Sequence, residues 1–191
     1  MVAATGGDGL IILGGYLRHL LRSGLVGMHI TDYLHEKRVP FEPLAHAPAF
    51  TAQRLAKYLR VPGKRVAKCV MLRGGGSNLV AVLPATCHVD TERLGGTLHA
   101  PVRIADDREI AAVFSDCEWG VVPAFGAVYG LVTLLEATFP ADALVVLPGN
   151  TRVESVRLRC SEFERLEKPR RLHFARDNDN PPRPAPLRDV S

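Results

Sequence analysis

The sequence lacks the short motifs that identify many enzymes of this size. It contains no GxSxG nucleophile elbow, no phosphate-binding P-loop, no HExxH zinc motif and no dinucleotide-binding fingerprint. These absences argue against the enzyme classes that the motifs define. Ser77 lies in a glycine-rich turn without a histidine and aspartate arrangement around it, so we do not expect it to act as a nucleophile.

Paired cysteines and long apolar runs are absent as well. The four cysteines, at positions 69, 87, 117 and 160, form no CxxC pair, so neither a zinc knuckle nor a redox motif is indicated. We expect reduced thiols and neither a metal nor a cofactor. No apolar run approaches the roughly 18 residues that span a membrane, and no basic residue precedes the short apolar stretch 10–13 as in a signal peptide. These features predict a cytoplasmic protein.

Composition and length predict a single domain with irregular ends. The chain has 191 residues, of which 47% are hydrophobic and 23% charged, as in an ordinary globular protein. Its net charge of +4 is compatible with a phosphate-rich partner but does not require one. We expect residues 1–27 to be an N-terminal extension that is disordered or precedes the true start, and the polar, proline-rich residues 173–191 to be a disordered tail. The domain itself is predicted at 28–172.

Short helices and strands are predicted in a mixed order along this domain. Apolar spacing and capping residues predict helices at 30–38, 52–59, 90–94 and 106–114, with a helical turn at 161–166. Strands are predicted at 41–45, 66–72, 79–83, 102–104, 121–122, 131–135, 143–147 and 153–158. The glycine-rich segment 74–78 joins two of these strands as a hairpin. The mixture indicates an α+β (mixed α/β) fold.

Lys68 is the most informative charged residue, because it lies in the middle of an apolar strand. A lysine there most often faces solvent, but strand alternation places Lys68 on the same face as Val66, Val70 and Leu72. An ammonium that shares a face with three aliphatic side chains indicates the rim of an apolar pocket.

Two loops are the other candidate contributors to a site. Residues 117–126 contain the single tryptophan, a proline and two glycines, which is typical both of a tight turn and of a backbone that approaches a ligand. In the second case glycine N–H groups could stabilise an oxyanion. His46 lies in a loop before Thr51, which is expected to cap the following helix.

The order of these segments resembles that of a known family. A His-Ala-Pro loop at 46–48 precedes Thr51 and its helix, and strands 66–72 and 79–84 are followed by His-Val-Asp at 88–90. Segments 114–120, 123–130 and 161–166 complete the set, which covers about residues 28–170. This order is similar to that of the YbaK-like aminoacyl-tRNA deacylases, relatives of the editing domain inserted in bacterial prolyl-tRNA synthetases. The resemblance implies a mixed, partly barrel-like sheet with flanking helices and one cleft.

The resemblance also implies a reaction and a set of site residues. The reaction is trans-editing, in which water hydrolyses the ester of a mischarged tRNA bearing a small amino acid of the alanine, serine or threonine class. Lys68 would hold the terminal phosphate and orient the ester, and backbone N–H groups near Gly120 would stabilise the oxyanion. The expected substrate-binding residues are His46, Thr51, Val66, Pro123, Phe125, Gly126 and Thr133. Of these, His46 or Thr133 could supply the hydrogen bond that a serine or threonine substrate needs.

Three positions depart from the family pattern. Ala124 stands where the family commonly has proline, Glu136 stands where it usually has aspartate, and residues 149–152 lack the usual histidine. The departures concern substrate choice and loop geometry, whereas Lys68 is retained.

Two other functions are compatible with these residues. One is a non-catalytic binding module for the aminoacyl-tRNA 3′ end or a small amino-acid derivative. The other is a thiol-dependent hydrolase that uses Cys69 or Cys117, which is less favoured because neither has a histidine close by in sequence. The expected partners are a mischarged tRNA and, transiently, an aminoacyl-tRNA synthetase, with no membrane. We expect a monomer or a weak dimer.

Overall fold

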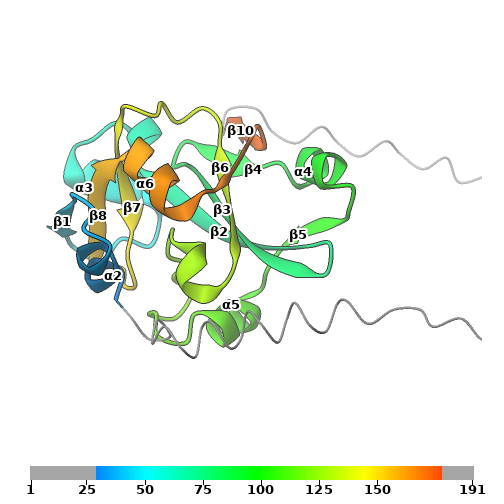
Figure 1. Ribbon diagram of the computed structural model, residues 1–191, viewed down its shortest axis with the longest axis horizontal. Helices are drawn as coiled ribbons and strands as arrows, with labels where there is room; N and C mark the ends of the chain where they lie inside the picture. Colours follow the sequence, from blue (N-terminus) through cyan, green and yellow to red (C-terminus); the bar gives the residue numbers. More distant parts are fainter. Residues whose placement is uncertain (1–28, 178–191) are drawn as a thin grey trace, which may run out of the picture.

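A five-stranded mixed sheet forms the centre of the structure, a computed structural model that describes residues 29–177 (Figure 1). Its strands are β2 (Ala67–Gly74), β3 (Ser77–Pro84), β5 (Val102–Ile104), β6 (Val132–Glu136) and β9 (Arg170–Leu172). They lie in the order β5-β2-β3-β6-β9. Strand β2 is antiparallel to β3 and β5, whereas β6 is parallel to β3 and to β9.

Strands β2 and β3 form a hairpin, which is the longest strand pair. The backbone conformation of its turn explains why glycine occupies positions 75 and 76. Gly75 and Gly76 have φ angles of 59° and 78°, which glycine adopts without steric cost. Side chains then alternate between the two faces of the sheet. In β3, Val80 and Val82 join the largest core cluster, whereas Leu79 and Leu83 join a second cluster on the opposite face.

Two smaller antiparallel sheets accompany the central one. Strands β1 (Glu42–Ala45), β8 (Glu154–Arg159) and β7 (Leu144–Pro148) form the first, in that order. A parallel bridge between Val66 and Val146 joins it to the start of β2. Strands β4 (Cys87–Val89) and β10 (Ala175–Asp177) form the second. Within residues 29–177 the edge strands β5 and β9 do not pair with each other, so the partly barrel-like sheet is not a closed barrel.

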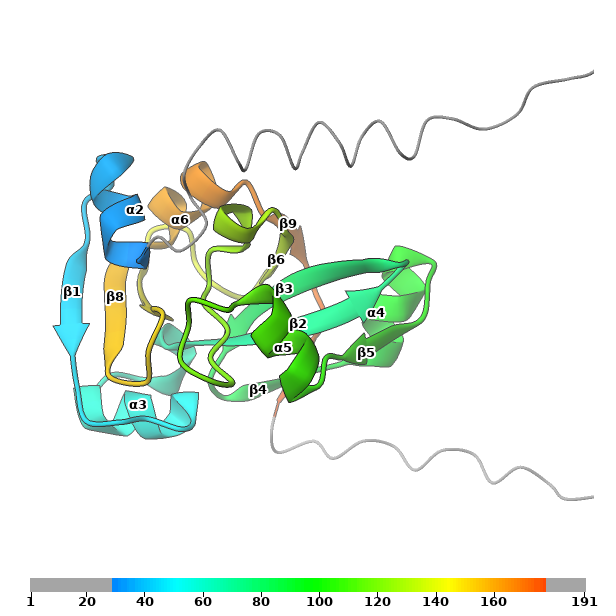
Figure 2. The ribbon, with the colours of Figure 1, turned by 90° about the horizontal axis from the view of Figure 1, so that it is seen from below.

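Five helices surround these sheets in the described part of the chain. They are α2 (Ile30–Glu36), α3 (Ala52–Leu59), α4 (Thr91–Leu98), α5 (Asp107–Val113) and α6 (Cys160–Glu167), with 3₁₀ turns η1 (Gly63–Arg65) and η2 (Gly126–Tyr129). Figure 2 shows α2 and α3 at opposite ends of the sheet that contains β1 and β8. Capping side chains set three helix starts: Thr51 accepts from Arg54 N at 3.2 Å, and Asp90 and Asp106 act likewise for α4 and α5.

The mixed α/β single domain and most of its predicted elements are confirmed. The predicted strand at 121–122 is wrong, because those residues lie in an irregular loop. The short strands β4, β9 and β10 were not predicted. None of the helices between residues 29 and 177 has the length and apolarity that crossing a membrane requires. The predicted extension at 1–27, and the part of the predicted tail from 178 onward, lie outside the described residues.

The fold continues beyond the predicted domain end at residue 172. Phe174 is fully buried in the second core cluster, and β10 pairs with β4. Glu136, itself 2% exposed, accepts hydrogen bonds from Phe174 N and Ala175 N, both at 2.8 Å. One aromatic side chain and one buried carboxylate therefore hold a segment whose polar composition indicated disorder. The glutamate that departs from the family pattern anchors this segment.

Candidate active site

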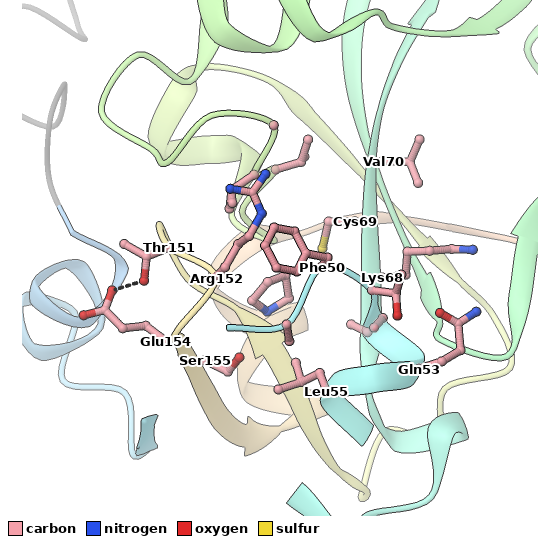
Figure 3. A pocket seen from close by; sticks show the side chains of 18 of the residues that line it. Phe50, Gln53, Leu55, Lys68, Cys69, Val70, Thr151, Arg152, Glu154 and Ser155 are labelled. Carbon is pink, nitrogen blue, oxygen red and sulfur yellow. Dashed lines mark hydrogen bonds between the residues drawn. The ribbon is translucent and has the colours of Figure 1, made fainter. Parts of the chain in front are cut away.

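A cleft with a volume of about 520 Å³ opens between the start of α3, strand β2, the loop around residue 120 and the turn that joins β7 to β8 (Figure 3). Four of the predicted site residues line it, although they are far apart in sequence: His46, Thr51, Lys68 and Gly120. The wall is mixed in character, since alanine and valine side chains lie among these polar groups. Such a cleft suits a small ligand that needs a few oriented polar contacts.

Lys68 extends from β2 and is fixed by strand β4. Its Nζ donates a hydrogen bond to Cys87 O and lies 3.5 Å from His88 Nδ1. Burial lowers the pKa of Lys68, and the charge of Lys68 is the main cause of the lowered pKa of His88. A neutral His88 ring can accept from the ammonium. Because an ammonium has three N–H donors, at least one remains for a ligand in the cleft.

Position 120 requires glycine for two reasons, its backbone conformation and the closeness of the Arg152 side chain. Its φ is 77°, and a Cβ there would lie 3.2 Å from Arg152 Nη2. Its N–H donates to no backbone acceptor within residues 29–177, whereas the next residue, Val121, donates to Glu118 O at 2.9 Å. Gly120 is exposed and lines the cleft, so its N–H is a candidate oxyanion donor.

The Gly120 loop is held by the turn between β7 and β8. Glu118 N donates to Asn150 O at 2.8 Å, and Arg152 N donates back to Glu118 Oε2 at 2.8 Å. The Arg152 guanidinium also pairs with Glu118 at 2.5 Å. These bonds, led by the backbone N–H of Arg152, lower the pKa of Glu118. Two segments about thirty residues apart in sequence thus form one cleft wall.

Asn150 lies in the segment where the family commonly has histidine, and its side chain is 2% exposed. Asn150 Nδ2 donates to Tyr129 OH at 3.2 Å and to Asp116 Oδ2 at 3.4 Å, while its Oδ1 accepts from Ile30 N at 2.8 Å. Burial raises the pKa of Tyr129, which remains a phenol that donates to Asp116 at 3.1 Å. This segment therefore connects the Gly120 loop to η2 and α2.

His46 forms a polar pair with Ser155 that the sequence did not indicate. His46 Nε2 lies 2.9 Å from Ser155 Oγ, and its Nδ1 lies 2.9 Å from Ala47 O. The carbonyl can only accept, so Nδ1 carries a proton when it bonds there, and Nε2 of the neutral ring accepts from the serine hydroxyl. Both side chains line the cleft, and Ser155 is 3% exposed.

Five of the predicted substrate-binding residues do not line the cleft: Val66, Pro123, Phe125, Gly126 and Thr133. Their assignment to its wall is therefore wrong. All five are buried in the interior.

Contacts within the core explain where these residues lie. Val66 packs in a third core cluster, below α3. Phe125 makes an edge contact with Phe163 at a ring separation of 5.3 Å. Thr133 Oγ1 donates to Glu167 at 2.8 Å, and a Cβ on Gly126 would lie only 2.6 Å from that hydroxyl. These residues therefore pack in the core that supports the loop at 117–126, and not in the wall of the cleft.

Sequence reasoning missed Phe50, His88, Arg152 and Ser155 as cleft residues. His88 was noticed only as part of the family pattern. The other three have no local signal, because their proximity depends on backbone bonds between distant segments. His46 N donates to Val153 O at 3.0 Å, and Ala49 N donates to Arg152 O at 2.9 Å.

The cysteines do not form a reactive site in the described residues. Burial raises the pKa of Cys69, and it raises that of Cys117 to about 11. A thiol with a raised pKa is a poor nucleophile at neutral pH, which argues against the thiol-hydrolase alternative. Residues 29–177 contain no group of three or more His, Cys, Asp or Glu side chains arranged to hold a metal ion.

Comparisons with known proteins identify the family of the chain. The profile of the aminoacyl-tRNA editing domain family matches residues 46–166, which is well over half of the chain. The matched range contains every one of the cleft residues named above. The chain belongs to the aminoacyl-tRNA editing domain family, which supports a role in aminoacyl-tRNA editing in general. No curated protein sequence matches the chain significantly.

Solved structures share the fold at low sequence identity. A hypothetical protein, APE2540, superposes with a TM-score of 0.70 at 15% identity, covering 77% of this chain and 99% of its own. A protein provisionally assigned as a trans-editing enzyme for prolyl-tRNA synthetase gives 0.64 at 17%, covering 71% and 87%. A provisionally assigned signal transduction protein from Marinobacter aquaeolei VT8 gives 0.58 at 20%, covering 73% and 28%. At such identities the likeness establishes the fold alone.

Proposed function

We propose that this protein is a trans-editing deacylase, which hydrolyses the ester of a mischarged tRNA that carries a small amino acid. The observation that supports this proposal best is that Lys68 and Gly120 line one cleft. The lysine supplies a positive charge with a free donor, and the glycine supplies a backbone N–H that donates to no backbone carbonyl within residues 29–177. Together they match the two charges of the reaction, a phosphate in the substrate and an oxyanion in the transition state.

Lys68 is the proposed phosphate ligand and orients the ester. Its contact with Cys87 O restricts the side chain before substrate binds, so little rotational freedom is lost on binding. Its partial burial strengthens the interaction with an anion, since less solvent screens the charge.

Gly120 is the proposed oxyanion donor. Water attacks the ester carbonyl carbon, and the carbonyl oxygen becomes an alkoxide that the Gly120 N–H stabilises. The intermediate then collapses and the bond to the ribose oxygen breaks. One proton of the attacking water ends on the ribose hydroxyl, and the other passes to solvent as the released carboxyl group ionises. An aminoacyl ester is already labile, so positioning and one or two donors supply a useful rate increase.

The amino-acid end of the substrate is proposed to lie by His46 and Ser155. Of the side chains predicted to supply a hydrogen bond to serine or threonine, His46 lines the cleft and Thr133 does not. Ser155 Oγ, bonded to His46, adds a second polar group. Alanine would need neither contact, and a larger side chain would be excluded by size. A second sieve of this kind is needed because one methylene changes binding by only about 1–3 kcal/mol.

The test is release of amino acid from a panel of charged tRNAs. Substrates that carry alanine, serine or threonine should be hydrolysed faster with the protein than without it, and those that carry leucine or phenylalanine should not. Binding without release would support the non-catalytic binding module instead. Cleavage of only the large side chains would refute the sieve.

Variants of Lys68 test its role directly. Lys68→Ala should fold normally and lower the deacylation rate by at least about tenfold, which corresponds to about 1.4 kcal/mol of barrier. Lys64→Ala removes an exposed lysine of η1 outside the cleft and serves as the matched control. Equal rates for the two folded variants would contradict the assignment.

A further inference from the structure

Phe50 is a large aromatic side chain that is left in solvent at the cleft. It immediately precedes Thr51, the cap of α3, lines the cleft, and is 70% exposed. An exposed phenylalanine gains none of the free energy that its burial would provide, and at the edge of a cleft its ring is accessible to a bound ligand.

Arg152 packs against this ring and fixes it. The guanidinium carbon lies 5.1 Å from the centroid of the Phe50 ring, and Figure 3 shows the two side chains next to each other. The backbone bond from Ala49 N to Arg152 O holds the segment before Phe50 in the same place. The ring is therefore oriented before any ligand binds.

The hydrogen bonds of Arg152 define its role. Its Nη1 pairs with Glu118, and its Nη2 donates to Trp119 O. With both terminal nitrogens engaged, the guanidinium is suited to support the Phe50 ring rather than to bind phosphate. The bond to Trp119 also connects the ring to the Gly120 loop.

Trp119 adds a second exposed aromatic surface beside Gly120. Its side chain is 61% exposed and lines a smaller neighbouring cavity of about 200 Å³, to which Gly120 also contributes. Two exposed aromatic residues are therefore connected through Arg152, which contacts the ring of Phe50 and the backbone oxygen of Trp119, the residue before the proposed oxyanion donor.

We infer that Phe50, supported by Arg152, is a stacking platform for an unpaired base at the 3′ end of the tRNA, with Trp119 beside it for a neighbouring base. This inference rests on the proposed function, which brings that end of the RNA to the cleft. Aromatic rings stack on any base and contribute about 1–3 kcal/mol per base, independently of sequence. Lys68 would bind the phosphate while Phe50 holds the base.

The experiment uses the full chain and an uncharged RNA minihelix with an unpaired 3′ end, in which 2-aminopurine replaces the terminal adenine. Fluorescence quenching reports stacking, and titration gives the Kd. Phe50→Ala and Phe50→Leu should weaken binding by roughly tenfold and reduce the quenching, whereas Phe50→Trp should retain both. The matched control is Tyr58→Ala, because Tyr58 is also exposed and packed by an arginine at 5.9 Å but does not line the cleft.

A second RNA that lacks the terminal base separates stacking from general damage. The wild-type protein should bind this RNA about as weakly as Phe50→Ala binds the intact one, and combining the two changes should cause no further loss. The loss of affinity caused by Phe50→Ala should also be similar at low and moderate salt, because stacking, unlike a phosphate contact, releases no counterions.

The outcomes distinguish this inference from the proposed function. Two results would overturn the platform even if charged tRNA is still hydrolysed. One is normal binding of the intact minihelix by Phe50→Ala. The other is that Phe50→Ala weakens binding of the RNA without the terminal base as much as it weakens binding of the intact RNA. Normal stacking without hydrolysis by the wild-type protein would refute the deacylase and leave the platform supported. A wild-type protein that does not bind the minihelix would overturn the platform, whereas the deacylase is decided separately by release of amino acid from charged tRNA.

Discussion

Glu167 allows a stability prediction whose sign and size follow from the structure. The residue ends α6 and is 8% exposed. Its Oε2 accepts from Thr133 Oγ1 at 2.8 Å and from Ala127 N at 3.1 Å, whereas its buried Oε1 has no partner in the described residues. Burial outweighs these two bonds and raises the pKa of Glu167 from 4.5 to about 7.

This pKa fixes the direction of the pH dependence. The folded protein binds the proton of Glu167 more tightly than the unfolded chain, so the stabilisation is fully present below pH 4.5 and is lost as the pH rises through about 7. The shift corresponds to about 3 kcal/mol. Glu167→Gln removes the titration and keeps an oxygen that can accept from Thr133.

The assay is urea unfolding of wild type and Glu167→Gln at pH 5 and at pH 8. The free energy of unfolding of the variant, relative to wild type, should increase by roughly 2–3 kcal/mol between these two pH values. Glu162→Gln is the control on the same helix, because Glu162 forms a surface ion pair with Arg165, and such pairs contribute at most about 1 kcal/mol. A difference between Glu167→Gln and wild type that is the same at both pH values would refute the reasoning.

Three further predictions test other parts of the structure. Phe174→Ala should destabilise the protein by about 3–5 kcal/mol in denaturant unfolding, because it empties a fully buried site beyond the predicted domain end; an unchanged midpoint would show that this segment is not packed in solution. Cys69→Ser and Cys117→Ser should each retain deacylation within about twofold, and chelator should have no effect, since no activated thiol contributes; loss on chelation that zinc restores would contradict this. Ser155→Ala should slow release of serine and threonine more than release of alanine, by roughly fivefold for one lost hydrogen bond; equal slowing of all three would indicate a general role.

The sequence predicted the parts of the fold that depend on local chemistry. The hairpin around Gly75 and Gly76, the helix capped by Thr51, and the cleft lysine all follow from neighbouring residues. Lys68 could be identified because a charged side chain is unfavourable among the aliphatic side chains of a strand, so its presence there indicates a function. Lys68, Val70 and Leu72 alternate along β2 and so share one face, as predicted. Val66 precedes β2 and packs in the third core cluster.

Contacts between distant segments account for what was not predicted. Ser155 approaches His46 across 109 residues, and only the pairing of β1 with β8 and the bonds of the adjoining loop bring them together. Thr133 was predicted to supply a hydrogen bond to a serine or threonine substrate, but its hydroxyl donates to Glu167 in the core. Phe174 was overlooked because a single aromatic residue among polar ones gives no periodic signal.

The pairing of β10 with β4 has a consequence for when this site can form on the ribosome. Cys87 O, which fixes Lys68, lies on β4, and within residues 29–177 the only strand that pairs with β4 is β10. Cys87 and its partner Asp177 are 90 residues apart. A nascent chain that exposes the lysine, the glycine loop and the cleft walls still lacks the strand that supports the lysine's anchor. The complete site should therefore form late, only after residues 175–177 have been synthesised and can pair with β4.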